Sequence, residues 1–289
     1  MIYLFATIAL NATLFALFKL FPRFGIDGLQ AIVVNYFVCV LTGSIFLGNF
    51  PITFESPHQS WFWWAVLMGV MFISIFNLIA WRTKEDGMTT TTIANKLSLV
   101  IPALFSVFLY GDQLTVLKVT GIVLAFPAVY LSTRTNTHTN KSKSLFYPAL
   151  LFVGSGLLDT LVKFTEHHYL STDAAQASFT VHIFAVAFII GAAVVTLLVA
   201  TGKRTLHWKN LLAGIILGVP NYFSIYYLIQ FLHEHVLQSS AAIPVNNIGI
   251  VLASTLVAII FFKEKLTLQR GIGLAFSLVA ILFLALSDG

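Results

Sequence analysis

Charged residues are scarce in this chain. Only 9% of its 289 residues are Asp, Glu, Lys or Arg, against about 25% in a typical soluble domain. So few charges cannot cover the surface of a water-soluble protein, and the 58% of hydrophobic residues, with 27 Phe, indicate surroundings that are largely lipid. The 16 Lys and Arg are spread among 11 acids and form no basic domain, so we expect no nucleic acid as a partner.

Cysteine is almost absent. Cys39 is the single cysteine and lies in an apolar run, so the sequence predicts no disulfide framework and no cysteine-based metal site. The sequence also lacks a P-loop, a nucleophile elbow and a soluble stretch long enough for an ATPase domain. We therefore expect neither an enzyme nor a cofactor or metal, and an intramembrane enzyme that acts on a lipid-soluble substrate is the alternative.

Long apolar runs are abundant. A helix needs about 20 mostly apolar residues to cross ~30 Å of hydrocarbon. The first run lacks a basic leading region and a small-residue cleavage site, which favours a retained span over a signal peptide. We predict an all-α membrane protein with ten transmembrane helices, at approximately 2–21, 28–48, 60–82, 88–110, 115–133, 145–165, 174–200, 208–232, 236–262 and 267–287.

Lys and Arg gather in one set of loops. Cytoplasmic loops hold an excess of these residues, so the count predicts that the loops after odd-numbered spans are cytoplasmic and that both termini lie outside. We expect a multi-pass protein of a bacterial plasma (inner) membrane, as a monomer or homodimer in the lipid bilayer. The basic residues of the odd-numbered loops include Lys19, Arg23, Arg82, Lys84, Arg134, Lys141, Lys143, Lys203, Arg204, Lys209, Lys263, Lys265 and Arg270.

The two halves of the chain resemble each other. When the segment 111–115 is aligned with 263–267, Asn95 falls on Asn247 and Gly121 on Gly273. With small gaps, further pairs follow in the same order, Lys19 with Lys163 and Gly69 with Gly218. Five spans are an odd number, so the second repeat enters the membrane from the opposite side. We predict two inverted five-helix repeats, 1–133 and 145–289, joined by a central loop over 134–144 and integrated in one bundle.

With these features the sequence resembles the drug/metabolite transporter (DMT) superfamily, EamA type. The resemblance rests on ten spans in two inverted fives, Lys19 near the end of the first span, Pro102 in the fourth, and an acidic turn before Leu-Thr after spans four and nine. That turn carries Glu264 in the second copy, whereas Asp112 replaces the usual Glu in the first. The resemblance implies transport but no particular solute. Family members are described with both termini cytoplasmic, opposite to the Lys and Arg count, so the orientation stays open.

Polar side chains within the spans are candidates for a solute site, because such groups are expensive in lipid and tend to face an interior cavity. Pro102 and Pro244 interrupt spans four and nine, and interrupted helices of inverted repeats meet near mid-membrane. The alternative for each amide is an interhelical hydrogen bond worth about 0.6 kcal/mol. The substrate-binding candidates are Asn95, Lys96, Asn246, Asn247, Tyr222, Tyr226, Asn11, Asn35 and Asn77.

Ionisable groups deep in the spans are candidates for coupling transport to protons. Asp159 and His182 are those candidates, with Lys96 as a cation for an anionic solute. Asp159 also lies one helical turn from Lys163, so a structural ion pair is the alternative. Together these features predict a secondary transporter or facilitator that moves a small organic solute, such as an amino acid, metabolite or drug, by alternating access.

Overall fold

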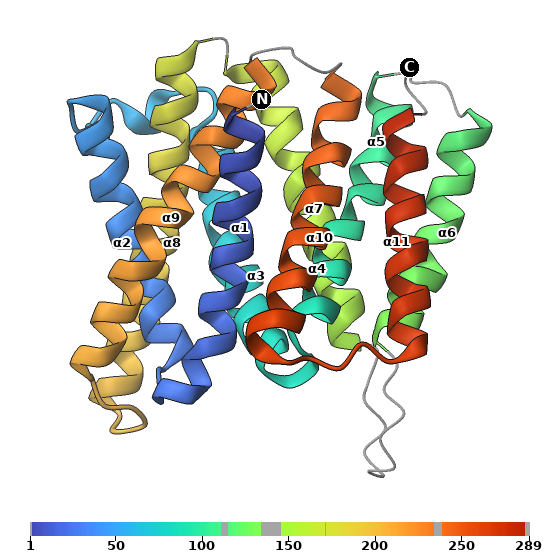
Figure 1. Ribbon diagram of the computed structural model, residues 1–289. Coiled ribbons are helices and arrows are strands. Elements are labelled where there is room, and N and C mark those ends of the chain that lie inside the picture. The colour runs from blue at the N-terminus through green and yellow to red at the C-terminus, as the bar shows by residue number, and fades with distance from the viewer. Residues whose placement is uncertain (1, 111–114, 134–145, 171, 234–238, 287–289) are drawn as a thin grey trace.

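The computed structural model describes residues 2–110, 115–133, 146–170, 172–233 and 239–286, and these form helices and connecting loops without a strand (Figure 1). The helix ends agree with the predicted runs to within four residues. The central loop 134–144 and Asp112 lie outside the described residues. The α-helices are α1 (Ile2–Leu20), α2 (Gly28–Leu47), α3 (Phe62–Asp86), α4 (Met88–Lys96), α5 (Val100–Tyr110), α6 (Val116–Thr133), α7 (Phe146–Tyr169), α8 (Asp173–Ala200), α9 (Trp208–His233), α10 (Ser239–Phe262) and α11 (Leu268–Leu286), with short 3-10 helices η1 (Phe21–Phe24), η2 (Ser56–His58) and η3 (Leu97–Leu99).

Eight of the described helices are long and apolar enough to cross a membrane. The chain is therefore an all-α, multi-pass membrane protein, as the composition predicts. The fourth predicted run falls short of that length because it is divided between α4 and α5 by η3. The fifth run is α6, which is 18 residues long.

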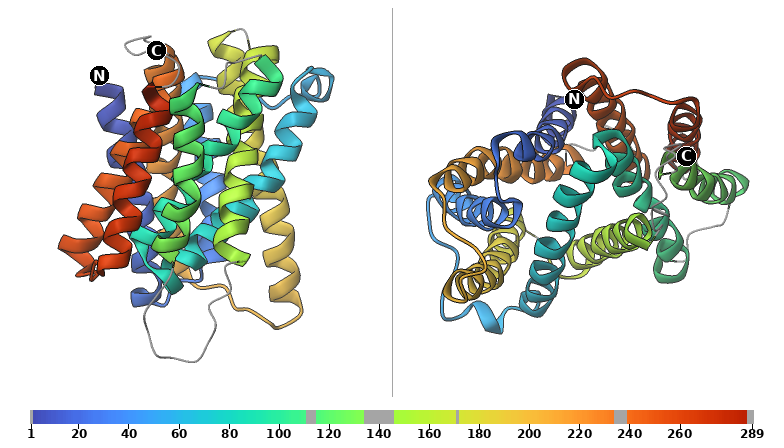
Figure 2. Two further views of the ribbon diagram at one scale, coloured as in Figure 1. Left: turned by 90° about the vertical axis from the view of Figure 1, so that its right-hand side faces the viewer. Right: turned by 90° about the horizontal axis from the view of Figure 1, so that it is seen from below.

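The helices stand side by side in one bundle (Figure 1). α2, α8 and α9 pack together at one side, α6 and α11 at the other, and the remaining helices lie between them, as the views in Figure 2 show. α1 begins and α11 ends at the upper end of Figure 1, which we call the upper face. The connections 21–27, 201–207 and 263–267 lie at the opposite end, the lower face. The lower face is the one to which the sequence assigns most Lys and Arg.

Glycine sets the closest approach of α9 to α2. A Cβ atom added at Gly218 would lie 2.6 Å from the Val38 Cβ and 2.9 Å from the Asn35 carbonyl oxygen. One turn earlier, a Cβ at Gly214 would lie 2.7 Å from the Ala31 carbonyl oxygen. Real Cβ atoms do not come this close to backbone, so these small residues allow a close crossing within the membrane.

The crossing of α3 and α8 is built in the same way. A Cβ atom at Gly69 would lie 2.7 Å from the Val186 side chain and 3.0 Å from the Ile183 carbonyl oxygen. As at Gly218, the glycine meets the carbonyl of one residue and the Val three positions later. The sequence alignment of the two halves pairs these two glycines.

We expect Gly218→Ala to lower the melting temperature of the detergent-solubilised protein, although Ala favours a helix over Gly by about 1 kcal/mol. The added methyl group would meet the α2 backbone, which cannot move aside cheaply. The matched control is Gly154→Ala, where the nearest heavy atom is a flexible Ile75 carbon at 3.5 Å. Equal melting temperatures for the two variants would contradict this account of the crossing.

Exposed residues on the two faces allow a test of orientation. Phe54 is 99% exposed in the α2–α3 connection on the upper face, and Leu206 is 68% exposed in the α8–α9 connection on the lower face. In a Cys39→Ala background, we expect Phe54→Cys to react with a membrane-impermeant thiol reagent in intact cells and Leu206→Cys to be shielded, because cytoplasmic loops hold an excess of Lys and Arg. The reverse labelling would establish cytoplasmic termini.

Candidate functional site

Helix α4 brings polar backbone and side chains into the middle of the bundle. The run Thr89–Thr92 is buried. Two of its hydroxyl groups bond to backbone carbonyls four residues earlier, Thr91 to Gly87 and Thr92 to Met88, each at 2.9 Å. The α-helix ends at Lys96, and the 3-10 helix η3 separates it from α5. A 3-10 segment within a helix often marks a functional hinge.

α4, α7 and α10 meet at this break, in what we call the α4–α7–α10 junction. The Asn95 side-chain amide donates to the Ser155 hydroxyl of α7 at 2.8 Å. The Asn247 amide of α10 donates to the Lys96 carbonyl at 3.5 Å. Gly156 allows the approach of α7, because a Cβ atom there would lie 2.7 Å from the carbonyl oxygen of Ser98. The structure thus brings Asn95 and Lys96 next to Asn247.

Asp159 lies on the inward side of α7. The outward side of this helix is marked by the exposed Leu150, Val153 and Leu157. At about 100° per residue, Asp159 lies roughly 200° round the helix from Leu157, on the face of the buried Ser155 one turn away. Its side chain is nevertheless exposed. Ser155 accepts a hydrogen bond from Asn95 of α4, so Asp159 lies one turn from the α4–α7–α10 junction.

The cation that interacts with Asp159 is Lys96. The two side chains act on each other electrostatically, and Lys96 is half-buried. Among the described residues, however, no nitrogen–oxygen contact within 4.0 Å joins them. The sequence alternative, an ion pair of Asp159 with Lys163 of the same helix, stays open.

Asn246 adds an acceptor beside the junction. Its side chain is 2% exposed, and its Oδ1 has no hydrogen-bond partner among the described residues. Asn246 lies one turn from Ile250, which belongs to the same buried cluster as Ala94 of α4. An amide oxygen buried without a donor costs about 1–3 kcal/mol, so this oxygen is suited to a donor from outside the protein.

Helix α10 continues through its proline. The sequence suggests matching irregularities in spans four and nine, but only span four is broken in the described residues. Pro244 lies in the second turn of α10, near the start of the helix. There a proline removes one backbone hydrogen bond without ending the helix. The irregular backbone therefore comes from one half of the molecule.

Three of the predicted amides make contacts within or between helices away from the junction. Asn11 and Asn77 donate to the carbonyls four residues earlier, at 2.9 and 2.8 Å. Asn35 of α2 is fully buried and accepts a hydrogen bond from Asn221 of α9 at 3.1 Å. Its oxygen also lies 3.8 Å from the sulfur of Cys39. Only the Asn35 contact is the interhelical hydrogen bond of the alternative, whereas Asn11 and Asn77 bond within their own helices.

The structure does not bring the predicted tyrosines to the junction. The Tyr222 ring fills the space beside Gly43 of α2, where an added Cβ would lie 2.7 Å from the ring. The Tyr226 ring lies 4.7 Å from that of Phe46, centroid to centroid. Both tyrosines of α9 thus pack against α2.

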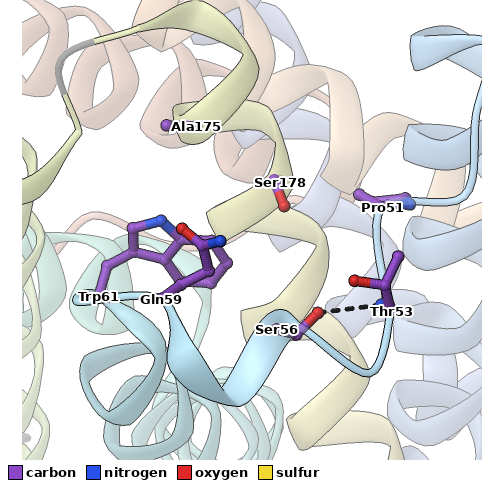
Figure 3. Close-up of a pocket in the computed structure, with 7 residues that line it drawn as sticks. All are labelled: Pro51, Thr53, Ser56, Gln59, Trp61, Ala175 and Ser178. Atoms are coloured by element: carbon purple, nitrogen blue, oxygen red, sulfur yellow. Dashed lines mark hydrogen bonds between the residues drawn. The ribbon is translucent and has the colours of Figure 1, made fainter.

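His182 lies in α8, near the upper face. Its Nδ1 is 2.7 Å from the Ser178 carbonyl and its Nε2 is 2.8 Å from the Ser56 hydroxyl. A carbonyl only accepts, so Nδ1 carries a proton. The two contacts of His182 join η2 to α8. A cavity of about 170 Å³ lies beside it (Figure 3), lined by the uncharged residues Pro51, Thr53, Ser56, Gln59, Trp61, Ala175 and Ser178.

A contact that the sequence analysis missed closes the lower face. Glu264, in the α10–α11 connection, lies 2.9 Å from the Lys19 ammonium of α1. Its carboxylate also accepts the backbone N–H groups of Met88 at 2.8 Å and Thr89 at 3.3 Å. We call this contact of Glu264 with α1 and the start of α4 the Glu264 clamp. The acidic turn and Lys19 were both noted in the sequence, but nothing there indicated that they meet.

Gly87 makes the Glu264 clamp possible. Its φ of +98° favours glycine, and an added Cβ would lie 2.9 Å from a Glu264 carboxylate oxygen. Burial of the carboxylate raises the pKa of Glu264, but the hydrogen bonds from Met88 and Thr89 and the Lys19 charge outweigh burial, so the pKa lies below its usual range. A carboxylate at a helix N-terminus is favoured by the helix dipole as well.

We expect Glu264→Gln to lower the free energy of unfolding at neutral pH by about 1–3 kcal/mol, because charge-assisted hydrogen bonds are lost. A carboxylate whose pKa is lowered by folding stabilises the protein above its unfolded pKa, and this contribution disappears as the pH falls through the lowered value. Melting temperatures in detergent from neutral to acidic pH should therefore fall more steeply for the wild type than for Glu264→Gln.

The matched control for the clamp is Glu55→Gln. The Glu55 side chain is 83% exposed, and its contact with His58 is at 3.9 Å, so its loss should change stability little. If Glu264→Gln and Glu55→Gln melt alike across the pH range, the clamp does not stabilise the structure.

Comparisons with known proteins identify no function. No known family model matches the chain. An uncharacterized protein of Haemophilus influenzae is 24% identical over 224 residues, which are 76% of this chain and 74% of that protein. A protein of known crystal structure superposes with a TM-score of 0.59 at 11% identity, covering 97% of this chain and 98% of that one. This likeness is one of fold alone.

Proposed function

We propose that this protein is a secondary transporter or facilitator that moves a small organic solute across the membrane by alternating access. The observation that carries the proposal is the α4–α7–α10 junction, where the oppositely charged residues Lys96 and Asp159 lie beside a broken helix. Ionisable groups within membrane spans are costly and mark solute and ion pathways. Backbone irregularity in a membrane is tolerated where it is buried or lines a water-filled cavity.

The pattern of helix contacts supports two inverted five-helix repeats. The repeats would relate the helices in pairs: α1 to α7, α2 to α8, α3 to α9, α4 and α5 to α10, and α6 to α11. When each helix is replaced by its counterpart, the α2–α9 contact becomes the α3–α8 contact. In the same way, α1–α9 becomes α3–α7, and α1–α10 becomes α4–α7. The pairs α2–α8, α4–α10 and α6–α11 map onto themselves. Contacts of this kind are expected along a pseudo-two-fold axis in the membrane plane, where inverted-repeat carriers place their solute sites.

The Glu264 clamp supports alternating access. It joins the α10–α11 connection of the second half to α1 and α4 of the first half at the lower face. Arg270 of α11 adds a second link by donating to the Asp86 carbonyl of α3 at 3.3 Å. Such polar links can separate and re-form as the halves move. In the proposed cycle this state is closed at the lower face.

The remaining parts of the proposal follow from the sequence. The resemblance to EamA-type members of the DMT superfamily favours a carrier, and a bacterial inner membrane fits the asymmetry of Lys and Arg. An intramembrane enzyme is the second candidate, because an accessible carboxylate beside a lysine at mid-depth also suits proton transfer. A carrier returns its solute unchanged, whereas an enzyme alters it without needing two compartments.

The decisive experiment uses purified protein in liposomes loaded with a broad mixture of labelled metabolites, with and without a pH gradient. We expect protein-dependent exchange of at least one unaltered solute across the membrane. Chemical conversion without vectorial flux would favour the enzyme, and the absence of both would contradict transport.

For the solute identified in this way, we expect Lys96→Ala and Asn247→Ala each to reduce flux strongly, by about tenfold or more, because each removes a polar contact from a low-dielectric site. Expression in the membrane and the melting temperature are measured in parallel. The control is Phe261→Ala on α10, whose side chain is 71% exposed on the apolar surface. Wild-type flux in both junction variants would show that the solute site lies elsewhere.

A further inference from the structure

We propose that the α4–α7–α10 junction recognises a zwitterionic solute, with Lys96 binding the anionic group and Asp159 the cationic group. This inference rests on the proposed transport function and specifies the chemistry of its site. It is carried by one arrangement: two opposite charges, on α4 and α7, lie beside the hydrogen bond that joins Asn95 to Ser155 and form no direct ion pair among the described residues.

The separation of the two charges is the first step of the argument. Lys96 and Asp159 interact electrostatically, yet among the described residues they form no direct ion pair within 4.0 Å. Unpaired charges within a membrane span are costly, so a purely structural pair would be expected to close. A solute with one negative and one positive group can place them against Lys96 and Asp159 and form a charge-assisted hydrogen bond with each.

Because Lys96 and Asp159 carry opposite charges, a solute with a single charge is a poor ligand for this site. An anion bound at Lys96 also feels the repulsion of Asp159, and a cation bound at Asp159 feels that of Lys96. In a site of low dielectric such repulsion is large. A zwitterion avoids it, because each of its charges lies nearer to the opposite charge of the protein. The junction therefore favours a dipolar solute with no net charge.

The internal repeat indicates that the pair does not serve packing. The alignment that pairs Asn95 with Asn247 places Ile248 at the position of Lys96. The alignment that pairs Lys19 with Lys163 places Phe15 at the position of Asp159. Phe15 is buried among apolar neighbours. The equivalent place in the other half thus folds without either charge, so both charges are specific to one side of the junction.

The amides around the pair can orient the solute. The Asn246 Oδ1 is buried without a donor among the described residues, and it accepts from an ammonium or hydroxyl group. Asn95 and Asn247 are already committed to Ser155 and to the Lys96 carbonyl. They hold the ends of α4 and α10 in place while the solute binds the charges.

The test uses three panels of labelled solutes that share the same carbon skeletons. The first holds neutral zwitterions, namely uncharged-side-chain α-amino acids, β-alanine and 4-aminobutyrate. The second holds the matching amines without the carboxylate, and the third the matching carboxylates without the amine. Exchange is measured in liposomes without a pH gradient. We expect the wild type to exchange at least one zwitterion about tenfold or more faster than its amine and its carboxylate.

Two single variants should change selectivity in opposite directions. Asp159→Asn should lose zwitterion selectivity and accept the carboxylate panel, and Lys96→Met should accept the amine panel. The double variant Lys96→Asp with Asp159→Lys should regain zwitterion exchange, with the solute bound in the opposite orientation. Lys209→Met, an exposed lysine at the start of α9, controls for the loss of one positive charge, and melting temperatures show that each variant is folded.

Several results would overturn the inference. A wild type that exchanges single-charge solutes as well as zwitterions, or Asp159→Asn that keeps zwitterion exchange and loses only proton-driven accumulation, would assign Asp159 to coupling instead. Transport of other solutes, with no zwitterion moved, rejects the inference but leaves the proposed function intact. The absence of flux for every solute in the broad mixture rejects both.

Discussion

Lipid offers no hydrogen-bond partners, so polar groups inside this bundle must be satisfied by protein or by water. Asn11 forms a hydrogen bond within its own helix, and Asn35 forms one with Asn221 of a neighbouring helix. Lys96 and Asp159 form no direct ion pair with each other among the described residues. In the proposed transporter, this difference separates contacts that serve packing from groups that are available to a solute.

Helix positions could be predicted from the sequence because a membrane span needs one long apolar run that ends at charged or turn residues. The break between α4 and α5 could not be placed in this way, since residues 88–110 are apolar enough to continue as one helix. The 3-10 turn at Leu97–Leu99 lies where Asn95 and Gly156 bind α4 to α7. Tertiary contacts of this kind have no local signature in the sequence.

The candidate site was predictable only where the repeat supplied long-range information. Alignment of Asn95 with Asn247 suggested that α4 and α10 meet, and the two helices do pack together. Helical spacing indicated Lys163 as a neighbour of Asp159, but it is local information and could not indicate that Lys96 of another helix also acts on Asp159. The Glu264 clamp could not be predicted from the sequence, because it joins three segments far apart in the chain and none of them indicates that it contacts the others.

Helix α4 has only nine residues, so at about 1.5 Å per residue it is a rod of roughly 13 Å. One end supplies the N–H groups that hold Glu264, and the other end carries Lys96. Two of its threonines, Thr91 and Thr92, bond to the backbone at the start of the helix. Because both ends belong to one short helix, a rigid shift of α4 would displace Lys96 and the Glu264 contact together.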